Sequence, residues 1–126
     1  MKAFIIFSTL FALNNAWKPA TIKDVDTFYD KCVKEENVPE PTESTKLERV
    51  HMCLVRCVAV EMGVYSKGKG FAEDRLVDQL YESGDKGKVR QTVKQCLKKT
   101  RNEDDCVNAY AGLTCADKER LYTITF

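Results

Sequence analysis

The chain has 126 residues, 44% of them hydrophobic and 31% charged, and this length suits one domain with a modest core. Its 20 basic and 19 acidic residues give a formal net charge of +1, so no global charge excess marks it as a nucleic-acid or anionic-membrane binder. Internal repeats, low-complexity tracts and N-x-S/T glycosylation motifs are absent from the sequence, which excludes repeat and fibrous architectures.

Residues 1–16, MKAFIIFSTLFALNNA, combine a basic residue, an apolar run from Ala3 to Leu13, and the small Ala16 at a plausible cleavage point. This order is typical of a secretory signal peptide, and a buried N-terminal helix is the alternative. The apolar run is shorter than the roughly 20 residues that span a bilayer, and no later run approaches that length. We expect a secreted, extracellular protein without stable membrane insertion, whose mature part, residues 17–126, is a single helical domain with an extended C-terminal tail.

The first element of the mature part is a predicted helix from Thr21 to about Glu36. Thr21 and Asp24 have the spacing of a capping box. The apolar positions that follow helical spacing are Ile22, Val25, Tyr29, Cys32 and Val33. Pro39 and Pro41 disfavour helix in the residues before them, so we expect a loop there.

A second capping box, Thr45 with Glu48, predicts a helix that runs to about Met62. Cys53 and Cys57 lie on this helix four positions apart, where their Cβ atoms are about 5–6 Å apart. A disulfide needs a Cβ separation of about 3.5–4.5 Å. The two thiols therefore point the same way and must reach other helices, which leaves the partner of each open.

Three more helices and a tail complete the chain. We expect a turn at SKGKG (66–70), a short helix within 71–82, and an amphipathic helix over 87–100. A last helix, from about 103 to 113, is expected to be capped by Asn102 with Asp105. The final RLYTITF alternates apolar residues with threonines, an extended pattern. The predicted fold class is all-α, with about six short helices.

The helix that carries Cys53 and Cys57 is apolar on its other faces as well. Val55 and Ala59 are rotated by about 200° from the cysteines, and Met62 continues their line. Core packing is the simpler interpretation for each residue taken singly. The other interpretation is an internal ligand cavity, because disulfides are most useful to a small domain whose interior forfeits packing contacts.

Six cysteines in a small secreted chain predict three disulfides. Their spacing, C-x20-C-x3-C-x38-C-x9-C-x8-C, resembles the insect odorant-binding proteins of the pheromone-binding and general odorant-binding type, although the first gap is shorter than is usual there. The resemblance covers essentially the whole mature chain. It implies six α-helices around an apolar cavity and three interlocked disulfides: Cys32–Cys57, Cys53–Cys106 and Cys96–Cys115.

The same resemblance implies a non-catalytic carrier of odorants, pheromones or similar lipophilic ligands. Its expected partners are a small hydrophobic ligand and a membrane chemoreceptor, with no nucleic acid, metal or other cofactor, and the protein is expected to be a monomer or weak homodimer. The candidate cavity lining is Val25, Phe28, Val55, Ala59, Met62, Leu76, Leu80, Val93 and Leu97, with a hydroxyl from Tyr110 or Tyr122. The tail, through Tyr122, Ile124 and Phe126, is expected to form a lid or a wall of the cavity.

A secreted salivary or venom effector that sequesters amines or lipids, or binds a host protein, is the alternative function. An amine trap needs a buried carboxylate, and acids near the proposed lining, such as Glu61 or Asp78, are examples of candidates. An enzyme is disfavoured because the single histidine and the committed cysteines leave no Cys–His pair, and zinc at Cys53 and Cys57 is disfavoured in an oxidising compartment.

Two further features have a functional and a simpler interpretation. His51 could act as a pH switch, since histidine titrates near pH ~6.5, but a partly exposed helix histidine is the simpler interpretation. Residues 86–101 carry seven basic residues and no acid, and could meet an acidic partner or a membrane surface. Because NEDD (102–105) follows directly and partly neutralises this run, a solvated helix face is the simpler interpretation.

Overall fold

The computed structural model describes residues 16–40 and 47–120, and of residues 117–120 the backbone alone. Its helices are α2 (Ile22–Glu35), α3 (Arg49–Glu61), α4 (Glu73–Leu80), α5 (Lys86–Lys99) and α6 (Asp105–Arg120). Strands β1 (Tyr65–Ser66) and β2 (Gly70–Phe71) pair antiparallel at the predicted SKGKG turn, so the turn closes a small hairpin that the sequence did not indicate. The predicted all-α class is confirmed. Among the described residues, no helix is long and apolar enough to cross a membrane.

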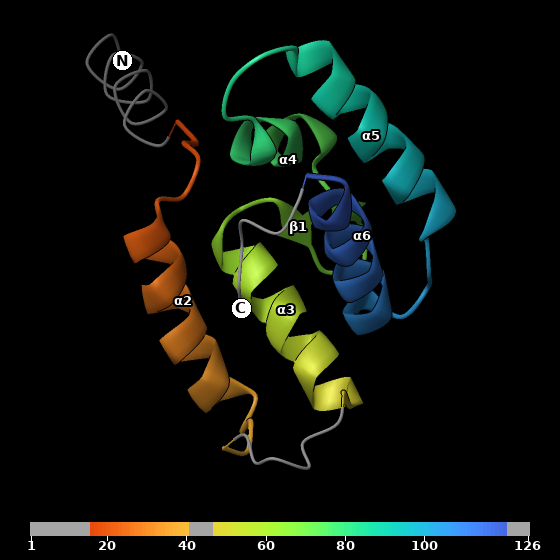
Figure 1. The fold of residues 1–126 in the computed structure, drawn as a ribbon. Helices are drawn as coiled ribbons and strands as arrows, with labels where there is room; N and C mark the ends of the chain where they lie inside the picture. The colour runs from red at the N-terminus through yellow and green to blue at the C-terminus, as the bar shows by residue number, and fades with distance from the viewer. Residues whose placement is uncertain (1–15, 41–46, 121–126) are drawn as a thin grey trace, which may run out of the picture.

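Helix α3 runs through the centre of the molecule (Figure 1). It packs against α2 on one side and most extensively against α6 on the other, while α4 and α5 pack together at one end. Helix α5 also contacts α6 and forms an outer edge of the fold. Residues 50–65 are all buried or half-buried, as expected for a helix that is apolar nearly all round.

The three disulfides have the pairing that the resemblance implied. Cys32–Cys57 joins α2 to α3, Cys53–Cys106 joins α3 to α6, and Cys96–Cys115 joins α5 to α6. The two cysteines that lie four apart on α3 therefore reach different helices, in agreement with the helix geometry.

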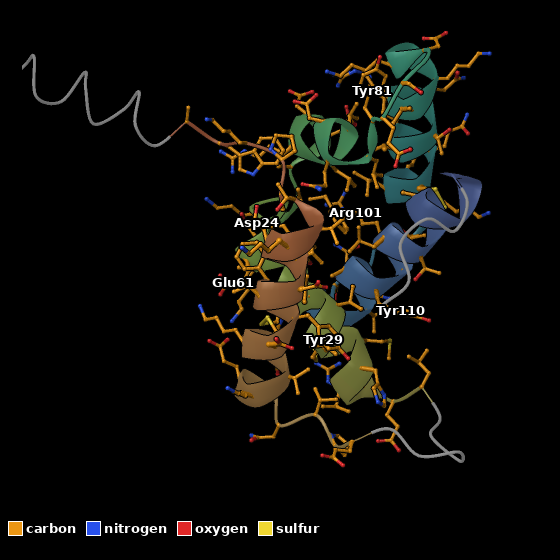
Figure 2. All side chains as sticks on the ribbon, turned by 60° about the vertical axis from the view of Figure 1, so that its left-hand side comes forward. Asp24, Tyr29, Glu61, Tyr81, Arg101 and Tyr110 are labelled. Carbon is orange, nitrogen blue, oxygen red and sulfur yellow. A yellow bond between two sulfur atoms is a disulfide. The ribbon has the colours of Figure 1, made fainter. Side chains whose placement is uncertain are left out.

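Helix α2 begins and ends with complete capping motifs. Asp24 N–H donates to Thr21 Oγ1 at 3.1 Å and Thr21 N–H donates to Asp24 Oδ2 at 2.9 Å, which confirms the predicted capping box. The backbone hydrogen bond from Thr21 is the main cause that lowers the pKa of Asp24, which lies in the first turn of α2 (Figure 2). At the other end Asn37 adopts φ +53° and Val38 N–H donates to Val33 C=O at 3.1 Å. This Schellman motif ends the helix as predicted and folds Val38 back onto it.

Helix α3 starts later than predicted. Glu48 is its N-cap instead of its third residue, and Glu48 N–H donates to His51 Nδ1 at 3.0 Å. The predicted box of Thr45 with Glu48 is therefore wrong, and Thr45 itself lies outside the described residues. The imidazole of His51 accepts the hydrogen bond that a Glu or Gln side chain accepts in a standard capping box. A search for the standard motif does not find this cap.

Helix α6 runs over residues 105–120, and the prediction of 103–113 is wrong at both ends. Asp104 caps the helix, because its Oδ1 accepts from the N–H of Cys106 at 2.9 Å and of Val107 at 3.3 Å. The extra turns at the other end are stabilised by tertiary contacts, since Ala116 is buried against α4 and α5 and Cys115 is bonded to α5. Tertiary packing of this kind extends a helix beyond its local signals.

The residues before α2 are bound to α3 and α4. Trp17 Nε1–H donates to Met62 C=O at 2.9 Å, and the Arg75 guanidinium lies 5.4 Å from the centre of the Trp17 ring. Ala20 makes two backbone hydrogen bonds with the Gln79 amide, of 2.7 and 2.9 Å. Residues 17–20 thus form an ordered strap across the end of α3.

An added methyl group at Gly63, which contacts this strap, is costly for two reasons. Its φ is +79°, and a Cβ there would lie 2.8 Å from Trp17 Nε1. We expect Gly63→Ala to lower the free energy of unfolding by roughly 2 kcal/mol or more, measured by urea denaturation of the oxidised protein.

Gly68→Ala is the matched control. Gly68 has φ +80° but nothing within 4 Å of an added Cβ, so only the backbone cost of about 1 kcal/mol is expected. Equal losses in the two variants would show that the Trp17 contact does not form.

Candidate functional site

The predicted lining residues of α4 and α5 lie in one cluster of the core. Leu76, Leu80 and Val93 are at most 4% exposed, and the half-buried Leu97 packs against them. Ala116 of α6 completes this cluster. These side chains fill the end of the molecule where α4, α5 and α6 meet.

The predicted residues of α2 and α3 lie in two other clusters. Val25 and Phe28 are half-buried against the buried residues around Cys32–Cys57, between α2 and α3. Ala59 is fully buried with residues of the hairpin and α6. Met62 packs against both clusters and so links the two faces of α3.

The remaining predicted residues are not assigned to these clusters. Val55 and Tyr110 are half-buried, and Tyr110 lies on α6 (Figure 2). Tyr122, Ile124 and Phe126 lie outside the described residues. The described part of the predicted set is thus divided over separate core clusters, and its contact with a ligand stays a prediction.

A groove of about 490 Å³ lies between the C-terminal half of α2 and the start of α3. It is lined by Tyr29, Asp30, Val33, Lys34, Val38, Pro39, Glu40, His51 and Leu54. Its volume falls within the range of sites for small organic molecules, about 300–1,000 Å³. None of these residues was in the predicted lining.

The groove is built mainly from the first cysteine gap, residues 33–52. The Schellman motif turns the chain so that Val38 packs against the cluster around Cys32–Cys57, and this disulfide holds the two helices that form the walls. The floor is apolar, with Leu54 only 8% exposed. A helix-ending Asn followed by an apolar residue was the signal in the sequence that places Val38 here.

Polar groups stand at the rim of the groove. Tyr29 points outward from α2 and is 37% exposed. Asp30 and Glu40 oppose Lys34 in charge, and His51 is oriented by the hydrogen bond from Glu48 N–H. An apolar floor with few polar groups at its edge suits a mainly hydrophobic molecule. The role of His51 as a pH switch stays a prediction.

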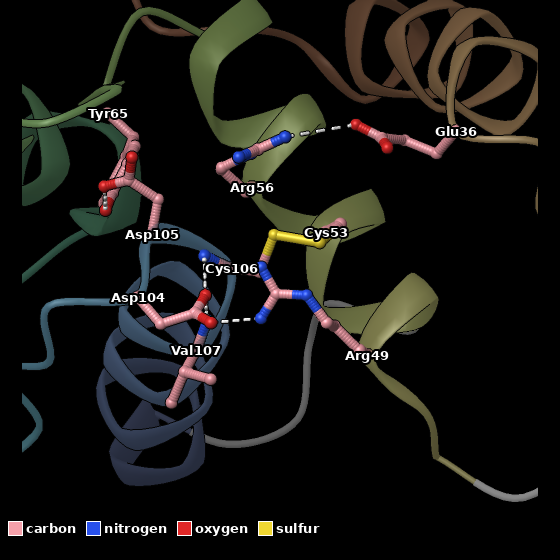
Figure 3. Close-up of a disulfide and its surroundings, with 9 residues drawn as sticks. All are labelled: Glu36, Arg49, Cys53, Arg56, Tyr65, Asp104, Asp105, Cys106 and Val107. Carbon is pink, nitrogen blue, oxygen red and sulfur yellow. Dashed lines mark hydrogen bonds and ion pairs between the residues drawn. A yellow bond between two sulfur atoms is a disulfide. The ribbon is translucent and has the colours of Figure 1, made fainter.

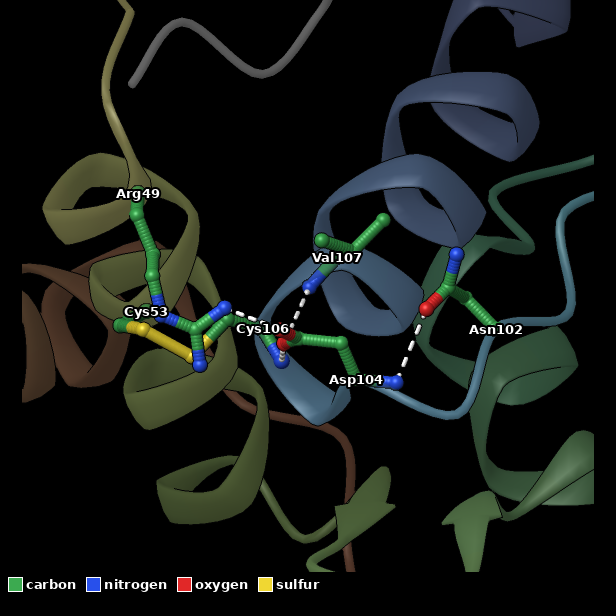
Figure 4. Close-up of polar contacts among 6 residues, drawn as sticks. All are labelled: Arg49, Cys53, Asn102, Asp104, Cys106 and Val107. Carbon is green, nitrogen blue, oxygen red and sulfur yellow. Dashed lines mark hydrogen bonds and ion pairs between the residues drawn. A yellow bond between two sulfur atoms is a disulfide. The ribbon is translucent and has the colours of Figure 1, made fainter.

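A second polar centre surrounds the Cys53–Cys106 disulfide (Figure 3). Arg49 of α3 pairs with the Asp104 carboxylate that caps α6, and this guanidinium is the main cause that lowers the pKa of Asp104. Asn102 Oδ1 in turn accepts from Asp104 N–H at 2.8 Å (Figure 4). An ion pair and a disulfide thus fix the same crossing of α3 and α6.

Asp105 joins the hairpin to α6. Tyr65 O–H donates to Asp105 Oδ1 at 2.6 Å, Gly68 N–H donates to its Oδ2 at 3.0 Å, and Asn108 Nδ2–H donates to the Tyr65 oxygen at 3.2 Å. Burial, followed by the hydrogen bond to Asp105, raises the pKa of Tyr65 to about 12. The neutral phenol and the carboxylate form a structural network.

A family model described as the PBP/GOBP family matches residues 14–119. The chain belongs to the PBP/GOBP family. The match includes all six cysteines and every described helix except the last residue of α6.

Two curated relatives align with nearly the whole chain. Odorant-binding protein 22 of Aedes aegypti is 30% identical over 131 residues, covering 98% of this chain and 95% of the relative. General odorant-binding protein 99a of Drosophila melanogaster is 26% identical over 138 residues, covering 98% of this chain and 94% of the relative. The similarity therefore extends over nearly the whole length of this chain and of both relatives.

One group of side chains in this PBP/GOBP chain has the composition of a metal site. Atoms of Cys32, Glu35 and Cys57 lie within 4.8 Å of one another. Both sulfurs belong to the disulfide between α2 and α3, so neither is a thiolate that can bind a metal ion. The group is part of the framework that forms the groove.

The Tyr65 network gives a pH prediction. The pKa of Tyr65 in the folded state is about 12, above its ordinary value of 10.0. The protonated phenol therefore contributes its full share to the stability of the fold below pH 10.0, and this contribution is lost as the pH rises to about 12. We expect Tyr65→Phe to lower the free energy of unfolding by about 1–2 kcal/mol at neutral pH, and the difference from wild type to shrink across that window. Urea denaturation followed by circular dichroism measures both.

Tyr81→Phe is the control, because the Tyr81 hydroxyl donates to Gly84 C=O at 3.1 Å in an exposed turn. Its expected cost is below about 0.5 kcal/mol. A Tyr65→Phe difference that stays constant up to pH ~12 would contradict the buried, hydrogen-bonded phenol.

Proposed function

We propose that this protein is a secreted carrier that reversibly binds small hydrophobic molecules, such as odorants, pheromones or similar lipophilic ligands. The observation that carries the proposal is its membership of the PBP/GOBP family, with 98% of the chain aligned to an odorant-binding protein. The disulfide-bonded helical framework and the apolar groove support it. Transfer of a ligand from water then recovers about 25 cal/mol per Å² of apolar area buried.

The predicted lining and the tail define the proposed main site. The half-buried members of the described set are the best placed, because a fully buried side chain already has neighbours on every side. They are Val25, Phe28, Val55, Met62, Leu97 and Tyr110. The groove between α2 and α3 offers a second apolar surface on the same stapled helix. In this proposal the protein has no catalytic role and no cofactor.

The proposal includes the maturation and the partners of the protein. Residues 1–16 act as a signal peptide that directs the chain into the oxidising secretory pathway, where its three disulfides form, and that is then removed. The mature domain, residues 17–126, is a monomer or weak homodimer that delivers its ligand to a membrane chemoreceptor.

The alternative, an effector that traps amines, is less well supported by the described acids. Glu61 Oε1 lies 2.7 Å from Lys31 Nζ, and Asp78 Oδ1 lies 2.6 Å from Lys86 Nζ. Both carboxylates named for such a trap are therefore paired with lysines at the surface. An amine ligand would have to displace an existing cation at either position.

Fluorophore displacement tests the carrier function. The oxidised protein is titrated with N-phenylnaphthylamine, then competed with long-chain alcohols, esters, fatty acids and biogenic amines. We expect saturable binding of one fluorophore per chain that the apolar panel reverses. Displacement by the amines alone would favour the effector, and no binding by protein with all three disulfides intact would overturn the carrier.

The tail has its own test within this assay. If Tyr122, Ile124 and Phe126 form a lid or a wall, deletion of residues 121–126 weakens binding or speeds ligand release, by roughly tenfold for the loss of three apolar contacts. Stopped-flow dilution measures the release rate. Substitution of Thr123 and Thr125 by Ala is the matched control and is expected to leave binding unchanged, whereas unchanged binding after the deletion would exclude the tail from the site.

A further inference from the structure

The seven basic residues of segment 86–101 have three different environments in the structure. Lys86 Nζ lies 2.6 Å from Asp78 Oδ1, and Arg90 Nη1 lies 2.5 Å from Asp74 Oδ1 and 3.6 Å from Glu73 Oε2. These two cations of α5 are therefore neutralised by acids of α4. Arg101 follows α5 and lines a polar hollow of about 510 Å³ together with Glu103.

The other four cations, all lysines, share one face of α5. At 100° per residue, Lys88, Lys94, Lys98 and Lys99 fall within an arc of about 140°, opposite the buried Val93. We call this the outer face of α5, and Gln91 and Gln95 complete it. All six side chains are exposed, and the four lysines make no ion pair with any described residue.

The acids that follow α5 in the sequence do not neutralise this face. Asp104 caps α6 and pairs with Arg49 of α3, while Asp105 accepts hydrogen bonds from Tyr65 and Gly68 of the hairpin. Asp104 thus belongs to the crossing of α3 and α6, Asp105 belongs to the contact between the hairpin and α6, and Glu103 lines the same hollow as Arg101. Within the described residues, no acid of NEDD forms an ion pair with the four lysines, so the outer face is a local positive field in a chain with a net charge of +1.

We propose that the outer face of α5 docks this protein on anionic lipid membranes. Lysine is a compact, hydrated charge that suits a diffuse layer of lipid headgroups, and the row from Lys88 to Lys99 extends over about 16 Å of helix. Specific protein interfaces are depleted of lysine and depend on aromatic or arginine anchors, which the outer face lacks. With no apolar side chain to insert, the contact is peripheral and sensitive to salt.

This contact places α5 against the membrane and leaves the groove between α2 and α3 at the opposite side of the fold, because α5 forms an outer edge away from α2 (Figure 1). A docked molecule therefore keeps that groove open to the aqueous phase. Docking does not require that a ligand be bound, so it can be tested independently of the carrier function.

Vesicle flotation tests the docking, with the full chain expressed in secreting cells and recovered oxidised from the medium. We expect flotation with phosphatidylcholine vesicles that contain about 30% phosphatidylserine, little with phosphatidylcholine alone, and loss of binding in roughly 0.5 M NaCl. The variant Lys88→Glu/Lys94→Glu/Lys98→Glu is expected to bind at least about tenfold more weakly. Inorganic phosphate at the ionic strength of the buffer is expected not to compete.

The control variant Lys18→Glu/Lys23→Glu/Lys67→Glu makes the same change in net charge at three exposed lysines outside α5. It should float as the wild type does. The neutral variant with glutamine at positions 88, 94 and 98 repeats the test without added acids, and circular dichroism verifies the fold of each protein. Equal flotation with both kinds of vesicle, equal losses in the two charge-reversal variants, or displacement by phosphate would each overturn the proposal.

Discussion

The rest of the structure depends on the attachment of one helix to two others through cysteines that lie a single turn apart. Cys57 fixes α3 to α2, and Cys53 fixes it to α6. In α2 only Cys32 is buried and Ile22 is 85% exposed, so this helix has little core of its own and depends on the disulfide and its caps. Cross-links of this kind compensate for the limited apolar burial of a domain of this size.

Polar contacts fix how α3, α6 and the hairpin are positioned against one another, in addition to the small apolar core. Asp104 both caps α6 and pairs with Arg49, next to Cys53–Cys106, and Asp105 attaches the hairpin through Tyr65. These contacts also keep the acidic side chains away from the lysines on the outer face of α5. The acids that follow α5 bind groups of α3, α6 and the hairpin, and the acids of α4 pair with Lys86 and Arg90 of α5. The outer lysines of α5 therefore have no ion-pair partner among the described residues. The contacts that hold the helices together thus also produce the positive charge on the outer face of α5.

The sequence was sufficient where the signal was local or belonged to a family pattern. Thr21 with Asp24 placed the start of α2, and the cysteine spacing implied the three pairs that the structure contains. It failed where a residue outside the standard motif or a tertiary contact decides. The pattern of Thr45 with Glu48 predicted the start of α3 too early, because His51 and not a carboxylate completes its cap. Burial of Ala116 against α4 and α5 extends α6 beyond its predicted end. The groove forms only because Val38 is turned back onto Cys32–Cys57. The lining residues were chosen by apolarity, which does not separate a side chain in the core from one that faces a ligand.

In the proposed function, the disulfide-bonded helices bind a ligand by burying its apolar surface. Isothermal titration calorimetry of the oxidised protein with a long-chain alcohol, at several temperatures, tests it most directly, because burial of apolar surface lowers the heat capacity. We expect one saturable site per chain with a clearly negative heat-capacity change, and no binding after the three disulfides are reduced. Binding with no heat-capacity change, or binding that the reduced chain retains, would contradict it.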